Sequence, residues 1–124
     1  MIYLDNSATT RQYPEVTREM LRYMDEFYGN PSSLYQLGVD SEKAVKKART
    51  ALQKAIGMED GRVYFTSGGT EADNMAIFGA ARALKRRGRR IVTTAVEHPA
   101  VLETMKYLET QGFSVTYLPV DHDG

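Results

Sequence analysis

The fold of this chain is decided by the stretch Arg62-Val63-Tyr64-Phe65-Thr66-Ser67-Gly68-Gly69-Thr70-Glu71-Ala72-Asp73-Asn74. Its first five residues are a short run typical of a β-strand, two glycines follow, and a helical pattern begins after them. We therefore predict a strand over residues 62–66, a tight turn and a helix. A strand that enters a helix through such a turn directs several backbone N–H groups toward one point, which suits an anion such as phosphate.

The same order of elements continues toward the C-terminus. A strand is predicted over residues 90–94, a helix after Pro99 and a further strand over residues 114–118. Strands that alternate with helices through short connections are typical of an α/β fold with a parallel or mostly parallel sheet and flanking helices. Residues 121–124 resemble the turn before another element, so we expect the chain to stop within its fold.

The N-terminal half reads as a polar arm followed by two helices. Apolar residues recur at three- and four-residue spacing after Pro14 and predict a helix that ends near Tyr28. The loop Gly29-Asn30-Pro31-Ser32-Ser33 follows. A second helix is expected to begin with Asp40 or Ser41 as its cap and to end at Gly57.

Composition excludes several classes of function. The 124 residues carry 16 basic and 16 acidic side chains, and a formal net charge of zero disfavours long-range attraction to nucleic acid or an anionic membrane. The absence of Cys excludes disulfides and thiolate metal sites, and two isolated histidines are poor material for a metal centre. No apolar run approaches the roughly 18 residues of a membrane span. We expect a cytoplasmic protein, with the basic run over residues 85–90 in a solvated turn after a helix.

The glycine turn supports two interpretations. In one, Gly69 and Thr70 bind an anion at the helix start, where the helix dipole favours negative charge. In the other, Thr70 only caps the helix, with Asp73 three residues later as in a capping box. The turn matches neither G-x-G-x-x-G nor G-x-x-x-x-G-K-[ST], which argues against NAD and ATP. The helix after the turn carries small residues that we expect to pack against the sheet: Ala72, Ala76, Gly79, Ala80 and Ala83.

His98 is the second candidate ligand residue. It follows the strand over 90–94, and the carboxyl ends of parallel strands are where open α/β sheets place their ligands. It should therefore lie near Thr70, where an imidazole could stack on a flat ligand or move a proton. A cap of the following helix is the alternative role. We expect His122 to be exposed, and the polar residues Asn6, Thr9 and Thr10 either contact a ligand or simply belong to an exposed arm.

Four segments together resemble the cysteine desulfurases of the NifS/IscS type, in the class V aminotransferase group of pyridoxal-phosphate (PLP) enzymes. They are Tyr3-Leu4-Asp5-Asn6-Ser7-Ala8-Thr9-Thr10, Gly29-Asn30-Pro31-Ser32-Ser33, Phe65-Thr66-Ser67-Gly68-Gly69-Thr70-Glu71-Ala72-Asp73-Asn74 and Glu97-His98-Pro99-Ala100-Val101. The resemblance covers the whole chain and about the first third of a family member. It implies the first half of the large domain of a fold-type-I PLP enzyme, with an arm over residues 1–14 and the α/β domain over 15–124.

The resemblance also implies roles for single residues. Gly69 and Thr70 would belong to the site of the PLP phosphate, and His98 would stack on the pyridine ring and take part in proton transfer. Residues 6–10 and 30–33 would form walls of the active site. The implied reaction takes sulfur from L-cysteine, leaves alanine and passes the sulfur to an enzyme Cys as a persulfide. An iron–sulfur scaffold or a tRNA-thiolation protein would accept the sulfur, and the family is homodimeric.

Several family features are different or missing. Ser7 stands where the family often has Ala, Tyr35 where it has His, and Pro14 comes later than the family's Pro. The Schiff-base Lys, the Asp for the pyridine nitrogen, the Arg for the substrate carboxylate and the mobile Cys all lie downstream in the family. The six lysines of this chain fall in predicted helices: Lys43, Lys46, Lys47, Lys54, Lys85 and Lys106. We therefore expect this chain alone to be inactive. The alternatives are a selenocysteine lyase or another class V enzyme, and a non-catalytic module that binds phosphate or a partner.

Overall fold

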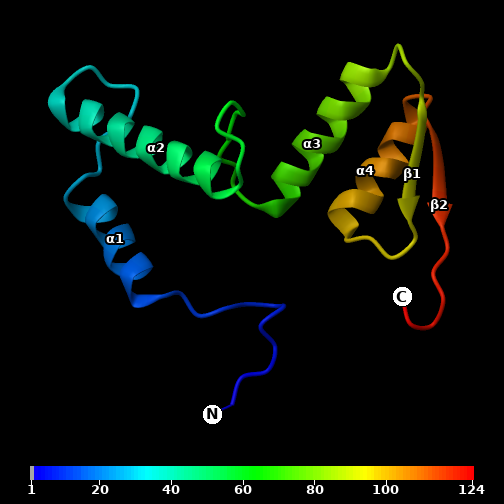
Figure 1. The fold of residues 1–124 in the computed structure, drawn as a ribbon, viewed down its shortest axis with the longest axis horizontal. Helices are drawn as coiled ribbons and strands as arrows, with labels where there is room; N and C mark the ends of the chain where they lie inside the picture. The colour runs from blue at the N-terminus through cyan, green and yellow to red at the C-terminus, as the bar shows by residue number, and fades with distance from the viewer. Residues whose placement is uncertain (1) are drawn as a thin grey trace. The chain divides into compact units, whose positions relative to one another are not determined.

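The computed structural model describes residues 2–124. Contacts within the chain divide it into two compact units, with the boundary in the sequence between Val63 and Tyr64. The first unit contains α1 (Pro14–Asp25) and α2 (Gln36–Ala55). The second unit contains α3 (Gly69–Leu84), β1 (Arg90–Thr94), α4 (Pro99–Thr110) and β2 (Ser114–Leu118) (Figure 1).

The second unit is a small α/β layer whose two strands run parallel. β1 pairs with β2 from Arg90 opposite Ser114 to Thr94 opposite Leu118, and the backbone N–H of Ala95 extends the pairing by donating to the Leu118 carbonyl at 2.9 Å. Both strands have the predicted bounds. α4 forms the connection between them and lies beside the strands (Figure 1). The parallel α/β arrangement predicted for this half of the chain is therefore confirmed.

The hydrophobic core of the second unit lies between α4 and its neighbours. Met105, Leu108 and Phe113 are buried, with exposed fractions of 6%, 3% and 9%. Partly buried residues from α3, α4 and both strands pack around them: Ile77, Phe78, Ala81, Ile91, Val101, Val115 and Tyr117. Gly112 adopts φ +81°, a conformation that favours glycine, at the turn from α4 into β2. The periodicity that predicted α4 thus marks the side chains that build this core.

The small residues of α3 do not pack as predicted. Ala72, Ala76, Gly79, Ala80 and Ala83 are all exposed, and a Cβ added at Gly79 would meet nothing within 4 Å. α3 instead packs on α4 through the other face, which carries Ile77, Phe78 and Ala81. The prediction was wrong because small size permits a close approach but supplies little apolar area to drive it.

The strand predicted over residues 62–66 does not form. β-rich composition supplies only propensity, and a strand exists when a neighbour completes its ladder of hydrogen bonds. Within residues 2–124 the sheet contains β1 and β2 only, and the Val63 carbonyl accepts from the Arg49 side chain at 2.9 Å instead. The helix after the turn nevertheless forms, and it begins at Gly69, within the glycine pair rather than after it.

In the first unit, both helices form with shifted ends. α1 starts at Pro14 and ends three residues before Tyr28, and α2 starts at Gln36 rather than after Asp40 or Ser41. The Ser41 hydroxyl is not a cap, because it donates to the Leu37 carbonyl at 3.0 Å and lies 3.3 Å from the Phe27 carbonyl, on the buried side of α2. Gly57 follows α2 with φ +65°, which confirms it as the stop.

The loop before α2 satisfies its own backbone, as its sequence predicts. The N–H of Ser32 donates to Asn30 Oδ1 and the N–H of Ser33 to the Asn30 carbonyl, both at 2.9 Å. Gly38 in the first turn of α2 lies against this loop, since a Cβ there would stand 2.5 Å from the Ser33 carbonyl oxygen. The close approach of loop and helix therefore requires glycine at this position.

Two further sequence predictions concern the basic run and membrane-spanning segments. The residues between α3 and β1, which carry most of the basic run, are exposed in a turn that directly follows α3, as predicted. In the part of the chain that the structure describes, none of the helices is both long enough and apolar enough to cross a lipid bilayer.

Candidate functional site

A groove of about 680 Å³ opens in the second unit between α3 and α4. Its lining residues are Thr70, Asn74, Phe78, Arg82, His98, Pro99, Ala100, Glu103, Thr104 and Tyr107. Thr70 and His98, which come from different loops of the sequence, therefore border one space. The sequence predicted that these two residues would be neighbours, and the structure confirms it.

The N-terminus of α3 offers backbone donors toward this groove. Gly68 is the N-cap and supplies no side-chain acceptor, and the first intrahelical bond runs from the Ala72 N–H to the Gly68 carbonyl at 3.1 Å. The N–H groups of the first turn, including that of Thr70, precede this bond and so lack an intrahelical partner. A Cβ at Gly68 or Gly69 would meet nothing within 4 Å, so neither glycine is required by close packing. This donor set suits an anion.

Thr70 does not cap α3. It is the second residue of the helix, not its N-cap, and its side chain is exposed at the groove. The capping-box interpretation of Thr70 with Asp73 is therefore wrong. The turn is closed another way, because the Thr66 hydroxyl donates to the Gly68 carbonyl at 3.1 Å. The Thr70 hydroxyl is left available to a ligand.

Glu71 closes the turn from the helix side. Its carboxylate accepts from both the backbone N–H and the hydroxyl of Ser67, each at 2.7 Å. The hydrogen bond from the Ser67 hydroxyl, followed by the bond from the Ser67 N–H, lowers the pKa of Glu71 below its ordinary value of 4.5. The carboxylate therefore stays charged at neutral pH and holds the turn in place.

His98 caps α4. It is the N-cap residue, and its Nδ1 accepts from the backbone N–H of Ala100 at 3.1 Å. An accepting Nδ1 carries no proton, so in this state the ring hydrogen resides on Nε2. The ring is exposed at the groove. The two roles considered for His98 are compatible, because the cap occupies Nδ1 while the ring face and Nε2 stay accessible.

Three local features set the position of His98. The Thr94 hydroxyl at the end of β1 donates to Glu97 Oε1 at 2.8 Å, which closes the loop just before His98. Pro99 occupies the first helical position, where its fixed φ favours the helix start. The Ala95–Leu118 bond ties the start of the same loop to the neighbouring strand.

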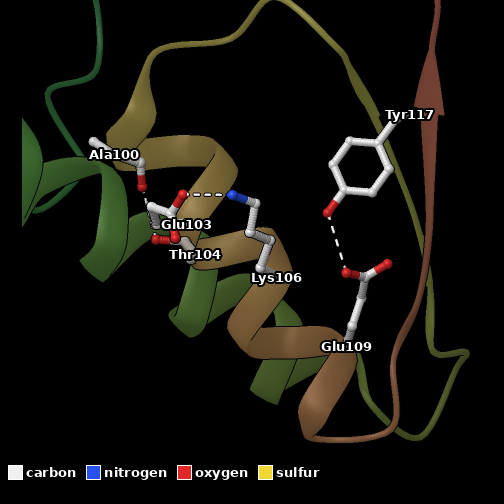
Figure 2. Close-up of polar contacts among 6 residues, drawn as sticks. All are labelled: Ala100, Glu103, Thr104, Lys106, Glu109 and Tyr117. Atoms are coloured by element: carbon white, nitrogen blue, oxygen red, sulfur yellow. Dashed lines mark hydrogen bonds and ion pairs between the residues drawn. The ribbon is translucent and has the colours of Figure 1, made fainter.

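Asn74 and Thr104 connect the two sides of the groove. Asn74 Nδ2 donates to the Thr70 carbonyl at 2.8 Å and lies 3.5 Å from the Ala100 carbonyl, while Asn74 Oδ1 accepts from the Thr104 hydroxyl at 2.7 Å. Thr104 also lies 2.7 Å from the Ala100 carbonyl (Figure 2). Asn74 belongs to the glycine-turn motif but had no predicted role, and Thr104 was not predicted. A polar residue at a core position of an amphipathic helix was the available signal for Thr104.

The far part of the groove is aromatic and carries one cation. The rings of Phe78 and Tyr107 meet edge to face with centroids 5.5 Å apart, and the Arg82 guanidinium lies 6.0 Å from the Phe78 centroid. The lining includes no lysine. Lys106 on α4 is paired with Glu103 at 2.6 Å (Figure 2), and this hydrogen bond raises the pKa of Lys106. It is therefore held in its charged form, which is not nucleophilic.

The remaining predicted residues lie elsewhere. Asn6, Thr9 and Thr10 are exposed in the first unit, where the Thr10 hydroxyl donates to the Asn6 carbonyl at 3.2 Å. The loop over residues 30–33 belongs to the same unit. A contact of either segment with the groove stays a prediction. His122 is exposed, as expected, with 89% of its side chain accessible.

Comparison with known protein families shows which family this chain belongs to. The family described as aminotransferase class-V matches residues 2–124. The chain belongs to the class-V aminotransferase family. Among curated relatives of this family member is the cysteine desulfurase IscS of Clostridium botulinum (strain Hall), which is 52% identical over 123 residues. The match covers 99% of this chain and 31% of that protein, so the chain spans about a third of the relative's length.

Solved structures agree with the class-V fold. A NifS-like protein superimposes with a TM-score of 0.88 at 43% identity, covering 97% of this chain and 33% of that one. A structure described as SspA in complex with cysteine gives a TM-score of 0.80 at 31% identity, with 94% and 33% covered. The α/β arrangement expected from the resemblance to the desulfurases is therefore confirmed over the third that this class-V chain spans.

Proposed function

We propose that this chain supplies the phosphate anchor and the stacking histidine of a PLP-dependent cysteine desulfurase. The observation that carries the proposal is the groove in which Thr70, at the open N-terminus of α3, and His98 meet. The similarity to cysteine desulfurases over 99% of the chain supports the reaction class.

The residues of the groove fit the two ends of PLP. A phosphate suits the first-turn N–H groups of α3 and the Thr70 hydroxyl, because helix N-termini and hydroxyls donate to anions. A flat pyridine suits the exposed imidazole of His98, which is fixed by its bond to Ala100. When bound, PLP supplies an electron sink for chemistry at the α carbon of an amino acid.

His98 is proposed to move a proton as well as to stack. Its Nδ1 is engaged by the Ala100 N–H, so Nε2 is the atom that exchanges a proton with substrate or solvent. The groove contains no lysine, and the sequence contains no cysteine. We propose that the Schiff-base lysine and the sulfur-carrying cysteine lie downstream, as in the family, and we expect the chain by itself to be inactive.

Substrate, partners and location complete the proposal. L-cysteine is the proposed substrate, and the sulfur leaves on an acceptor protein such as an iron–sulfur scaffold or a tRNA-thiolation protein. The similarity to SspA, described in complex with cysteine, supports the substrate. We propose a homodimer in the cytoplasm, with an arm over residues 1–14 and the PLP domain beginning at residue 15.

The decisive experiment is a chimera in which residues 2–124 replace the matched third of the C. botulinum relative. The chimera is expected to bind PLP and to release alanine from L-cysteine. Thr70→Ala should raise the PLP dissociation constant about tenfold, because a hydrogen bond to a charged group contributes about 1.5 kcal/mol. His98→Ala should lower turnover about a hundredfold, the lower end of what general acid–base catalysis contributes.

The matched control is Thr110→Val, which removes an exposed hydroxyl at the far end of α4 and should leave both quantities unchanged. Unchanged PLP affinity and turnover in both Thr70→Ala and His98→Ala would contradict the assignment. Release of alanine from selenocysteine but not from cysteine would instead favour a selenocysteine lyase. A chimera that binds phosphate but never PLP would favour the non-catalytic module.

A further inference from the structure

The Asn74 side chain bridges the first turns of α3 and α4. Its Nδ2 faces two carbonyl oxygens, those of Thr70 at 2.8 Å and Ala100 at 3.5 Å, and its Oδ1 faces the Thr104 hydroxyl at 2.7 Å. Carbonyl oxygens only accept, so the NH₂ group must point toward them and the amide oxygen toward Thr104. This arrangement fixes the orientation of the Asn74 amide, and its oxygen accepts from the Thr104 hydroxyl.

Ala100 carries the connection onward to His98. Its N–H donates to His98 Nδ1 at 3.1 Å, while its carbonyl lies within reach of Asn74 Nδ2 and 2.7 Å from the Thr104 hydroxyl. Ala100 and Thr104 are buried, with exposed fractions of 8% and 3%. Water therefore competes little for the bond between the Thr104 hydroxyl and the Ala100 carbonyl, and protein partners hold the two peptide groups that flank the Ala100 Cα.

One side chain thus touches both halves of the candidate site. On α3 it donates to the carbonyl of Thr70, a residue that lines the groove. On α4 it reaches the residue that sets the His98 ring. A change at Asn74 would therefore move the anion donors and the imidazole relative to each other, although Asn74 itself need not contact any reacting atom.

We propose that Asn74, with Thr104 as its partner, is a positioning residue that fixes the start of α3 and the His98 imidazole in one geometry. The inference rests on the proposed function, because it concerns the same groove. It extends that function because it says what holds the phosphate anchor and the histidine in a fixed relative position: the contacts among Asn74, Thr104 and Ala100.

The test compares four variants of residues 2–124 within the chimera proposed above. Asn74→Ala removes the bridge, Thr104→Val removes only the hydroxyl, and Thr104→Ser restores it. Thr110→Val is the matched control, because its hydroxyl makes a similar bond along α4, to the Tyr107 carbonyl at 2.7 Å, but lies outside the groove lining. Two quantities are measured: the ring ¹⁵N chemical shifts of His98, which report the tautomer, and the dissociation constants of PLP and inorganic phosphate.

The expected result separates the hydroxyl variants. Asn74→Ala should shift the His98 ring nitrogens toward the tautomer mixture of free imidazole and raise both dissociation constants about tenfold. Thr104→Val should act in the same direction with about a threefold effect, while Thr104→Ser and Thr110→Val resemble the unmodified chain. If Asn74→Ala does not fold, the contrast between Thr104→Val and Thr104→Ser decides.

Two outcomes overturn the inference. One is a His98 spectrum and PLP affinity that Asn74→Ala and Thr104→Val leave unchanged, and the other is a Thr110→Val variant that changes them as much. Failure of the proposed function gives a different result, because the unmodified chimera then binds neither PLP nor phosphate while the His98 shifts still respond to Asn74→Ala.

Discussion

The two units of the chain are built from similarly regular helices but differ in what those helices bury. In the first unit α1 has no buried residue, and the buried positions of α2 are Gly38 and Ser41. In the second unit α4 alone contributes four buried residues, among them Met105 and Leu108. An amphipathic pattern therefore locates a helix, but which apolar face becomes core depends on the elements that pack against it.

The largest effect is expected from the core of the second unit. Leu108→Ala should lower the free energy of unfolding of that unit by about 2–5 kcal/mol, because the removed methyl groups leave a cavity at a position only 3% exposed. Native-state amide hydrogen exchange in β1 and α4 measures this loss.

The counterpart in the first unit is Leu21→Ala. Leu21 lies in α1 with 58% of its surface exposed, so the same substitution should change stability by no more than about 0.5 kcal/mol. Equal losses for the two variants would contradict the difference in burial between the units.

Glycine substitutions sharpen the comparison with effects of opposite sign. Gly38→Ala in the first unit should destabilise it by about 1–3 kcal/mol, because the new Cβ would stand 2.5 Å from one backbone oxygen and 2.7 Å from another. Gly79→Ala in α3 should stabilise the second unit by about 0.5–1 kcal/mol, since its Cβ meets nothing and alanine favours the helix. Thermal unfolding of both variants gives the signs, and a shared sign would contradict the described packing.

The smallest effect concerns the pH dependence of the turn before α3. The pKa of Glu71 is lowered in the folded chain, so its contribution to stability is complete above the ordinary value of 4.5 and is lost as the pH falls through the lower folded value. The Ser67 amide resonance should therefore titrate with a midpoint below 4.5, and Glu71→Gln should abolish this step. A midpoint at or above 4.5 would show that the bonds to Ser67 do not form in solution.

Much of the second unit could be predicted from its sequence, because strong local signals agree there. The β-rich runs at 90–94 and 114–118, with the helical pattern between them, fix both the bounds and the parallel pairing. The run at 62–66 carries an equally strong signal and forms no strand, since pairing needs a neighbour that a local pattern cannot supply. The start of α2 was missed because Tyr35, its N-cap, makes no side-chain cap bond.

The sequence predicted that Thr70 and His98 border one site, but not the side chains that connect them. Each residue was expected to follow a strand at the same edge of a sheet, although the strand before Thr70 does not form. The bonds of Asn74 to Thr104 and Ala100 join residues 30 and 26 positions apart and leave no periodic trace in the sequence. Likewise, Gly68 rather than Thr70 is the N-cap because the helix begins two residues earlier than predicted, a shift that a local pattern does not resolve.

The parallel pairing of β1 and β2 also constrains the order in which the molecule can form. Every pair in that ladder joins residues 24 positions apart, such as Arg90 with Ser114, whereas the bonds within α1 and α2 join near neighbours. The chain between the two strands loses conformational entropy before the pairing can stabilise it. The helices can therefore form early and the ladder late. The loop that presents His98 lies inside that segment. Its bond from Ala95 to Leu118 is therefore expected to form with the ladder, after the short-range bonds that cap α4.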